Sequence, residues 1–320
     1  MTRMSPLRSL VSIAIKAASS HNTQPWKFRL DPQRITVMPD FARRCPVVDP
    51  DDHHLFASLG CATENLVLAA QVAGFHADVD IDPRSGEVRI DLETSVASTP
   101  VLFPAIDLRA CSRTAYDGSA LSADEARQLE AAGRGEGVSL RLLTDSRALE
   151  QVAEFVTAGN TAQFADHAWR RELQHWVRFN PRSARATGDG LYGPAMGNPA
   201  VPDWVGRLFM QLAFSAKSQN HTDIRHIRQS SAVAVLVSDH DDRRHWVEAG
   251  RCYERFALQA AALDLRTAFI NQPVEVAALR PQFAAHLGLA AGQRPDLLIR
   301  VGRGPLMPRS FRRPVDEVIV

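Results

Sequence analysis

The chain has 320 residues, of which 45% are hydrophobic and 23% charged, so it can bury a large core in one domain or in two intertwined ones. Its 37 lysine and arginine residues are balanced by 36 aspartate and glutamate residues, which argues against nucleic acid or an anionic membrane as a partner and favours a small molecule. Four scattered cysteines without a C-x-x-C pair argue against a disulfide framework and a thiolate zinc site, and indicate a reducing, cytoplasmic location.

The first hundred residues predict an opening helix, two short strands, a long helix and a further strand. Ser5-Pro6 is a helix-start pair, and apolar residues recur at helical spacing up to about Ala18. Lys16 interrupts this run, which argues against a signal peptide, and no apolar stretch approaches the roughly 18 residues that span a membrane. The expected strands cover residues 28–30, 34–38 and 87–92, and the long helix covers about 51–73 before Gly74.

A segment rich in serine, threonine and proline at residues 94–104 follows this unit and is a boundary candidate. We therefore expect a first half at residues 1–98 and a second half at residues 99–320. The second half is expected to contain helices that open at Ser122 and near Asp203 and that cover 149–174, 244–263 and 274–286, with strands at 139–143, 232–237, 267–270 and 297–301.

Residues 180–202 hold four glycines and four prolines, which is too many for a regular element. Long irregular segments in compact proteins are usually functional or mobile. We expect a lid that covers residues 180–220, including the start of the helical segment that follows.

Two of the expected helices can be aligned with each other. Residues at the same spacing recur with a constant shift of 190 (250 minus 60): Gly60, Glu64, Leu68 and Ala70 match Gly250, Glu254, Leu258 and Ala260. Helices rich in alanine and leucine also align by chance, so this similarity alone leaves both interpretations open. If it is real, it indicates two copies of one folding unit.

The densest cluster of short polar groups lies at residues 19–26, directly after the opening helix. This segment, Ser19-Ser20-His21-Asn22-Thr23-Gln24-Pro25-Trp26, offers hydroxyls, amides and an imidazole to a flat ligand with polar edges. A polar loop that merely docks Pro25 and Trp26 onto the core would have a similar composition.

This segment resembles the A-P-S-x-x-N-x-Q-P-W signature of the FMN-dependent nitroreductase family, with Ala18 at the usual proline. The resemblance implies that Ser19, Ser20 and Asn22 touch a flavin across the boundary between two subunits or halves, with His21 among the candidate contacts. It also implies that Gln24 holds the loop.

Two arginine-containing segments beyond residue 100 strengthen the resemblance. Arg109-Ala110-Cys111-Ser112-Arg113 is similar to the R-x-S-x-R element of the family, with Cys111 where serine or threonine is usual. The resemblance implies that Arg109 grips the phosphate and that Arg113 lies near the N1/O2 edge of the flavin. Without the family, two arginines four residues apart are most often a solvated face.

The C-terminal Arg312-Arg313-Pro314-Val315-Asp316-Glu317-Val318 run is similar to the R-R-P-L-E-E-V tail of the family. The resemblance implies a phosphate contact from Arg312, with Arg309 as a second candidate for this contact. It also implies that the backbone near Asn271 and Gln272 faces flavin N5 or O4, and that a glycine-rich insert at residues 188–199 covers the ring.

The first half carries the polar loop but no R-x-S-x-R element, and the second half carries the arginines but no second loop. The chain is therefore most similar to the fused, Acg-type branch, an α+β nitroreductase-like fold in which two halves of one chain form a pseudo-dimer around one FMN. This predicts a competent monomer and does not forbid a homodimer.

The resemblance implies an oxidoreductase in which NAD(P)H gives a hydride to FMN and a nitroaromatic or quinone acceptor then takes the electrons. An FMN-sequestering protein with a closed lid is the alternative, and a structural protein with a decayed site is a third. Other sites have weak support, because the sequence lacks a Walker motif, a complete dinucleotide fingerprint and a G-x-S-x-G motif. The pairs His53-His54 and His221 with His226 lack metal-site spacing, so no metal is expected.

Overall fold

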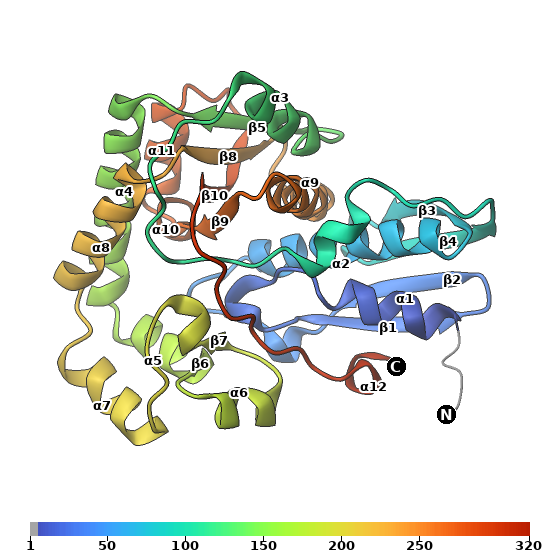
Figure 1. Cartoon of the computed structure of the whole chain (residues 1–320), viewed down its shortest axis with the longest axis horizontal. Coiled ribbons are helices and arrows are strands. Elements are labelled where there is room, and N and C mark those ends of the chain that lie inside the picture. Colours follow the sequence, from blue (N-terminus) through green and yellow to red (C-terminus); the bar gives the residue numbers. More distant parts are fainter. Residues whose placement is uncertain (1–5) are drawn as a thin grey trace.

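A computed structural model describes residues 6–320 and contains two four-stranded antiparallel sheets (Figure 1). In the first sheet the order is β1 (Trp26–Asp31), β2 (Arg34–Pro39), β4 (Val88–Thr94) and β3 (Phe75–Ile81). In the second it is β5 (Val138–Leu143), β8 (Ala232–Ser238), β10 (Arg294–Gly302) and β9 (Arg266–Phe269). Within each sheet the strands therefore stand in the order first, second, fourth and third.

In each unit a helix of 20 residues connects the second strand to the third: α2 (His53–Val72) in the first and α9 (Arg243–Ala262) in the second. These helices begin 190 residues apart (243 minus 53), the shift found in the sequence. They cross where a Cβ on Gly60 would lie 1.9 Å from the Val247 carbonyl oxygen, and a Cβ on Gly250 would lie 1.8 Å from that of Ala57. The contact is reciprocal, because Ala57 and Val247 also differ by 190.

One apolar core lies between the sheets and includes residues of α1 (Pro6–Ala14), α2, α9 and both sheets, such as Phe28, Leu59 and Leu297. The opposite face of the second sheet packs on α4 (Ser146–Ala165) and α8 (Ala216–Arg228), through Val152, Val235 and Ile227 among others. Because both of its faces are covered, every residue of β8 is buried, whereas β3 alternates between exposed and partly buried positions.

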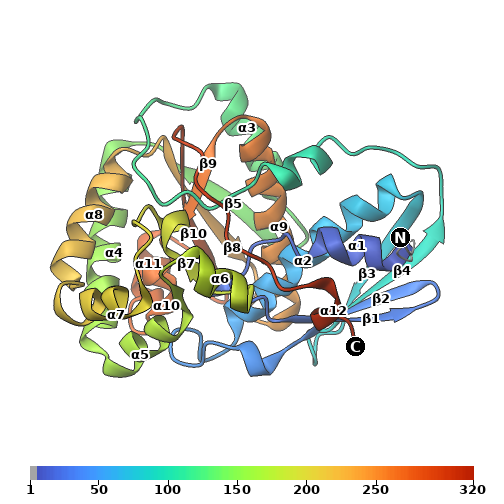
Figure 2. The ribbon, with the colours of Figure 1, turned by 60° about the horizontal axis from the view of Figure 1, so that its bottom comes forward.

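Segments of the chain cross between the two units. Residues before Arg113 reach the edge of β9, where Cys111 forms a bridge with Thr267 and the Ser112 amide donates to the Thr267 carbonyl at 2.9 Å. The C-terminal segment returns to the first sheet, where the Val320 amide donates to the Phe28 carbonyl at 3.0 Å (Figure 2). The two units are thus intertwined.

The remaining elements complete the outline. They are α3 (Ala123–Ala132), α5 (His167–Trp176), α6 (Pro181–Thr187), α7 (Asp203–Leu212), α10 (Gln272–Glu275), α11 (Arg280–His286), α12 (Val315–Val318), the short strands β6 (Val177–Arg178) and β7 (Leu191–Tyr192), and 3-10 turns at η1 (Ser20–Asn22), η2 (Phe41–Arg43), η3 (Phe103–Asp107) and η4 (Gly193–Met196).

Several sequence predictions of local structure were wrong. The segment expected to be irregular contains α6, because the Asn180 side chain caps its start, Pro181 occupies its first turn and Gly188 ends it with a left-handed φ of 65°. The expected helix at 149–174 is broken at Asp166, whose side chain caps α5. The expected helix at 274–286 is two short helices, and β3 was not predicted. Ser5, the expected N-cap, lies outside the described residues.

Among residues 6–320, α2 is the one helix long and apolar enough to cross a membrane, contrary to the expectation from the sequence. Of its apolar window, 83% is buried inside the protein, as in a core helix.

The helix crossing predicts a loss of stability when Gly250 is replaced by alanine. The added Cβ would collide with the Ala57 backbone, so α2 and α9 must separate, and we expect the free energy of unfolding to fall by about 1–3 kcal/mol in spite of the higher helix propensity of alanine. Urea denaturation measures this. Gly193→Ala is the control, since its Cβ would meet nothing within 3.4 Å; equal stability of the two variants would contradict the close crossing.

Candidate functional site

The polar loop at residues 19–26 folds into a strained turn that its own side chains hold. His21, Asn22 and Gln24 have φ values of 47°, 53° and 53°, in the left-handed region that non-glycine residues rarely occupy. The Gln24 amide donates to Ser19 Oγ at 3.1 Å, and the Ser20 amide donates to Ser58 Oγ of α2 at 3.1 Å. Such strain persists where surrounding contacts impose it, commonly at ligand sites.

The glycine-rich insert and the C-terminal segment close on this loop. Gln24 Nε2 donates to the Gly188 carbonyl at 2.8 Å, while its Oε1 accepts from the Arg313 amide at 2.8 Å. Asn22 Nδ2 donates to the carbonyls of Gly190 and Phe311 at 3.1 and 3.0 Å. Gln24 therefore holds the loop, as the resemblance implied, and it does so by joining three segments distant in sequence.

Arg109 and Arg312 meet the loop at its N-terminal side. Arg312 Nη1 donates to Asn22 Oδ1 at 2.9 Å, and its Nη2 donates to the Lys16 carbonyl at 3.2 Å. Arg109 Nη2 donates to the same carbonyl at 2.8 Å, and its Nε lies 2.9 Å from Glu254 Oε1. The structure thus brings Asn22, Arg109 and Arg312 into one cluster.

The charge of this cluster is incompletely balanced. Within the described chain Arg312 has no carboxylate within 4.0 Å, and burial together with the nearby charge of Arg109 lowers the pKa of Arg312 to about 9. The exposed Arg309 contributes to the same shift, so it lies near Arg312. Arg109 differs, because Glu254 already neutralises it.

Arg113 borders a second part of the site. It is partly buried, its Nη1 lies 3.8 Å from Met196 Sδ, and no ion pair to it is found in residues 6–320. Burial and the charges of Arg113 and His54 lower the pKa of His21 to about 4, so these three groups are close neighbours. His21 is therefore neutral at physiological pH.

Cys111 lies at the edge of β9 between the two arginines and is half-buried. The next residue, Ser112, is fully buried, and its hydroxyl has no hydrogen-bond partner in the part of the chain that the structure describes. The sequence did not single out Ser112, because it occupies an unspecified position of the R-x-S-x-R element.

Asn271 and Gln272 start α10 at the end of β9. Asn271 Oδ1 accepts from the Leu298 amide at 2.8 Å. Gln272 Nε2 donates to Asn160 Oδ1 at 3.1 Å, while its Oε1 is buried and has no partner among the described residues. Such an unpartnered carbonyl indicates room for a donor from a ligand or water.

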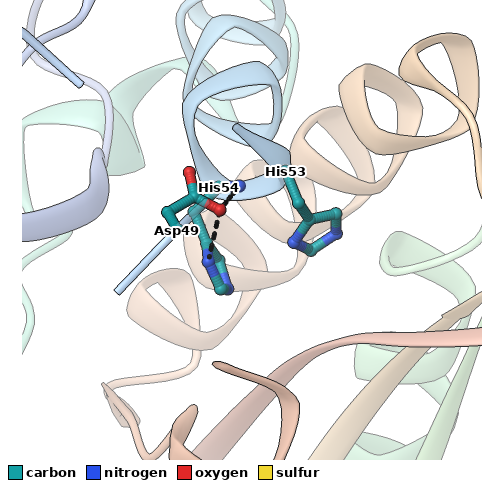
Figure 3. A group of neighbouring side chains, drawn as sticks. All are labelled: Asp49, His53 and His54. Atoms are coloured by element: carbon teal, nitrogen blue, oxygen red, sulfur yellow. Dashed lines mark hydrogen bonds and ion pairs between the residues drawn. The ribbon is translucent and has the colours of Figure 1, made fainter. Parts of the chain in front are cut away.

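Asp49, His53 and His54 form a buried cluster at the start of α2 (Figure 3). Asp49 accepts the backbone amides of His54 and Leu55, at 3.0 Å each, and so caps the helix. Its Oδ1 lies 3.4 Å from His54 Nδ1, and His53 Nε2 lies 2.8 Å from Asp296 Oδ1. Each of the three side chains offers one atom that could bind a metal ion, and these atoms lie within 4.8 Å of one another. Because both Asp49 oxygens already accept amides, we assign the cluster to helix capping.

The two sheets and the helices that cover them make an α+β protein, which is similar in sequence to proteins named as nitroreductases. No family model matches the chain. "Putative NAD(P)H nitroreductase Rv3131" of Mycobacterium tuberculosis is 28% identical, covering 98% of this chain and 90% of that protein. "Putative NAD(P)H nitroreductase acg" of the same species is 25% identical, covering 98% and 94%. The similarity thus extends over almost the whole chain.

Solved structures align less closely. A nitroreductase with bound FMN from Bacteroides fragilis covers 67% of this chain and 96% of its own, at 12% identity and a TM-score of 0.41. A nitroreductase with bound FMN from Desulfitobacterium hafniense covers 69% and 98%, at 10% identity and a TM-score of 0.42. The similarity to nitroreductases therefore rests on the relatives that align over 98% of this chain.

The Asp296 carboxyl predicts a pH dependence of stability. Burial raises the pKa of Asp296 to about 7, whereas an unfolded aspartate has a pKa of about 3.9. Between pH about 4 and 7 the native state keeps this proton and the unfolded state does not. The contribution of Asp296 to stability is therefore fully present below pH about 4 and is lost as the pH rises to about 7, at roughly 1.4 kcal/mol per pH unit. Asp296→Asn should lack this slope, so the variant should gain stability relative to the native protein between pH 4 and 7. Chemical denaturation at several pH values tests this; parallel curves would contradict it.

Proposed function

We propose that the protein is an FMN-dependent NAD(P)H oxidoreductase that passes electrons to a nitroaromatic or quinone-type acceptor. The observation that carries the proposal is the convergence of Asn22, Arg109 and the partly buried Arg312 on one cluster, in which Arg312 has no ion pair among residues 6–320. The relatives named as NAD(P)H nitroreductases support the choice of reductant.

The residues present fit a phosphate-bearing flavin. Arg312 lacks a carboxylate among the residues described, and with a pKa lowered to about 9 it is still a cation at neutral pH, so an anion beside it would be favoured. Exposed Arg309 can add to the phosphate site, whereas Arg109 has its Nε and Nη2 engaged and can offer Nη1. Arg312 is engaged as well, because its Nε donates to the Ile15 carbonyl at 2.9 Å and its Nη1 and Nη2 donate to Asn22 Oδ1 and to backbone carbonyls. A phosphate gripped by either arginine would therefore replace some of these contacts.

Groups beside the arginines fit the flavin ring. Arg113 is a partly buried cation without an ion pair anywhere in residues 6–320, and Gln272 Oε1 is a buried acceptor without a donor. FMN supplies the hydride chemistry when bound, so the protein needs no catalytic acid or base of its own. Its residues bind the phosphate, supply positive charge at the ring edge and restrict access of water.

The architecture supports one site per chain. We infer that residues 1–98 and 99–320 correspond to the two subunits of a dimeric nitroreductase joined in one polypeptide. The two sheets have the same strand order, and α2 and α9 are related by the shift of 190. The polar loop comes from the first half and the arginines from the second, so a monomer in the cytoplasm would be competent.

The second candidate function is sequestration of FMN with little turnover. It is favoured by the packing of the insert at residues 188–190 directly on the polar loop. Asp189 fastens this insert, because it forms ion pairs with Arg43 of η2 and with Arg178 of β6, the latter at 2.7 Å. A lid over residues 180–220 that stayed in this position would limit access to the ring.

Replacing Arg312 by glutamine tests the phosphate site. Loss of a charge-assisted contact of about 1.5–3 kcal/mol should weaken FMN binding about 10- to 150-fold in a fluorescence titration. Arg34→Gln is the control, because Arg34 is exposed at the start of β2, and this variant should bind as the native protein does. Unchanged affinity of the Arg312 variant would place the phosphate elsewhere, and failure of NADH and NADPH to bleach the bound flavin anaerobically would contradict the oxidoreductase.

Replacing Asp189 by asparagine tests the insert. Without the ion pairs to Arg43 and Arg178, the insert should open more often and anaerobic bleaching by NAD(P)H should accelerate several-fold. Asp203→Asn is the control, since Asp203 contacts Asn180 within the same insert at 2.9 Å. Faster release of FMN without faster bleaching would favour sequestration, and no change in either rate would contradict the lid.

A further inference from the structure

The Asn271 side chain extends the hydrogen-bond ladder between β9 and β10 beyond the end of β9. The Ile270 amide donates to the Leu298 carbonyl at 2.9 Å, and the Leu298 amide then donates to Asn271 Oδ1 at 2.8 Å. The backbone carbonyl of Asn271 accepts the amides of Val274 and Glu275 at 2.9 Å each. One residue therefore ends a strand and starts α10.

This arrangement fixes the direction of the Asn271 amide. Because Oδ1 accepts from Leu298, Nδ2 points away from the strand, and it lies 3.4 Å from Nε2 of His54. An amide nitrogen only donates, so His54 Nε2 must be unprotonated in this contact. The proton of the neutral ring is then on Nδ1, which faces Asp49 Oδ1 at 3.4 Å (Figure 3).

The contact lies beside the candidate flavin site. His54 and Arg113 both lower the pKa of His21 after burial, so His54 is close to the polar loop. Burial raises the pKa of Glu275, and the charges of His54 and Arg113 oppose that rise, so α10 is close to the same groups. Gln272, next to Asn271, has the unpartnered Oε1. His54 thus joins α2 of the first half to the edge of the site in the second half.

We propose that His54 is a positioning residue for the flavin site: its neutral ring accepts from Asn271 and so holds residues 271–274 in place for the cofactor. This inference rests on the proposed function for the identity of the cofactor. The positioning itself is a property of the protein and can be measured without FMN.

Protonation of His54 would release Asn271. An imidazolium presents N–H at Nε2, which would face the Nδ2 amide hydrogens, so the amide would have to rotate and give up Leu298. Burial opposes this charge, but Asp49 and then Glu275 outweigh it and raise the pKa of His54, with Arg294 opposing. The other titratable neighbours are His53, Asp296 and His21. FMN affinity should therefore fall as the pH is lowered through this pKa.

Two neutral variants separate the contacts of His54. In His54→Gln the side-chain amide reaches the former position of Nε2 and can accept from Asn271. In His54→Asn it reaches the position of Nδ1 and can contact only Asp49. Both variants lose the ring, so the difference between them isolates the contact to Asn271.

The first readout is FMN affinity measured by fluorescence titration between pH 6 and 8. We expect His54→Gln to bind within about threefold of the native protein, and His54→Asn to bind about tenfold more weakly, as loss of one hydrogen bond would cause. The ratio of the native to the His54→Gln dissociation constant should rise as the pH falls. Equal affinities of the two variants and a constant ratio would overturn the proposal.

The second readout is hydrogen exchange of the Leu298 amide in protein freed of FMN. We expect protection in the native protein and in His54→Gln, loss of protection in His54→Asn, and loss in the native protein as the pH falls, after correction for intrinsic rates. If a variant does not fold, the pH dependence of Leu298 exchange in the native protein alone tests the positioning role. Leu298 protection that is independent of pH and of both variants overturns the positioning role even if FMN binds. If Leu298 exchanges as expected but the protein does not bind FMN, the proposed function is refuted and the positioning role of His54 is not.

Discussion

The close crossing of α2 and α9 is the contact on which the rest of the structure depends. Only glycine at positions 60 and 250 allows each helix to approach the backbone of the other, because a Cβ would lie within 2 Å of a carbonyl oxygen. This approach merges the apolar faces of the two units into one core. It also sets the start of α2, with His54, against the second half and sets Glu254 of α9 against the polar loop of the first.

The repeated helices have diverged where the site is built. Glu64 and Glu254 are equivalent under the shift of 190, but Glu64 pairs with Arg251 and Arg255, at 3.1 and 2.9 Å, in a structural ion cluster. Glu254 instead lies 2.9 Å from Arg109 and accepts the Ala18 amide at 3.3 Å, directly before the polar loop. One equivalent acid supports the site and the other stabilises the helix pair, which agrees with a single site per chain.

The signals from which the site was predicted are local in the sequence. The polar loop, the two arginine segments and the shift of 190 are each visible within a short stretch, and the structure brings Asn22, Arg109 and Arg312 together. The contact between His54 and Asn271 could not be predicted, since these residues are 217 apart and no pattern in the sequence links one to the other. Asp78 and Asp80 concealed β3, because aspartate is depleted in strands. The start and stop signals of α6 were present at Asn180, Pro181 and Gly188 but were outweighed by the glycine and proline content of the segment.

In the proposed arrangement, one chain assembles one flavin site from both halves. The most direct measurement is the ratio of flavin to polypeptide, taken from the absorption spectrum of the protein after saturation with FMN and removal of the excess. A single site built from both halves predicts a yellow protein with one FMN per chain. A colourless protein, or one that retains two flavins per chain, would contradict it.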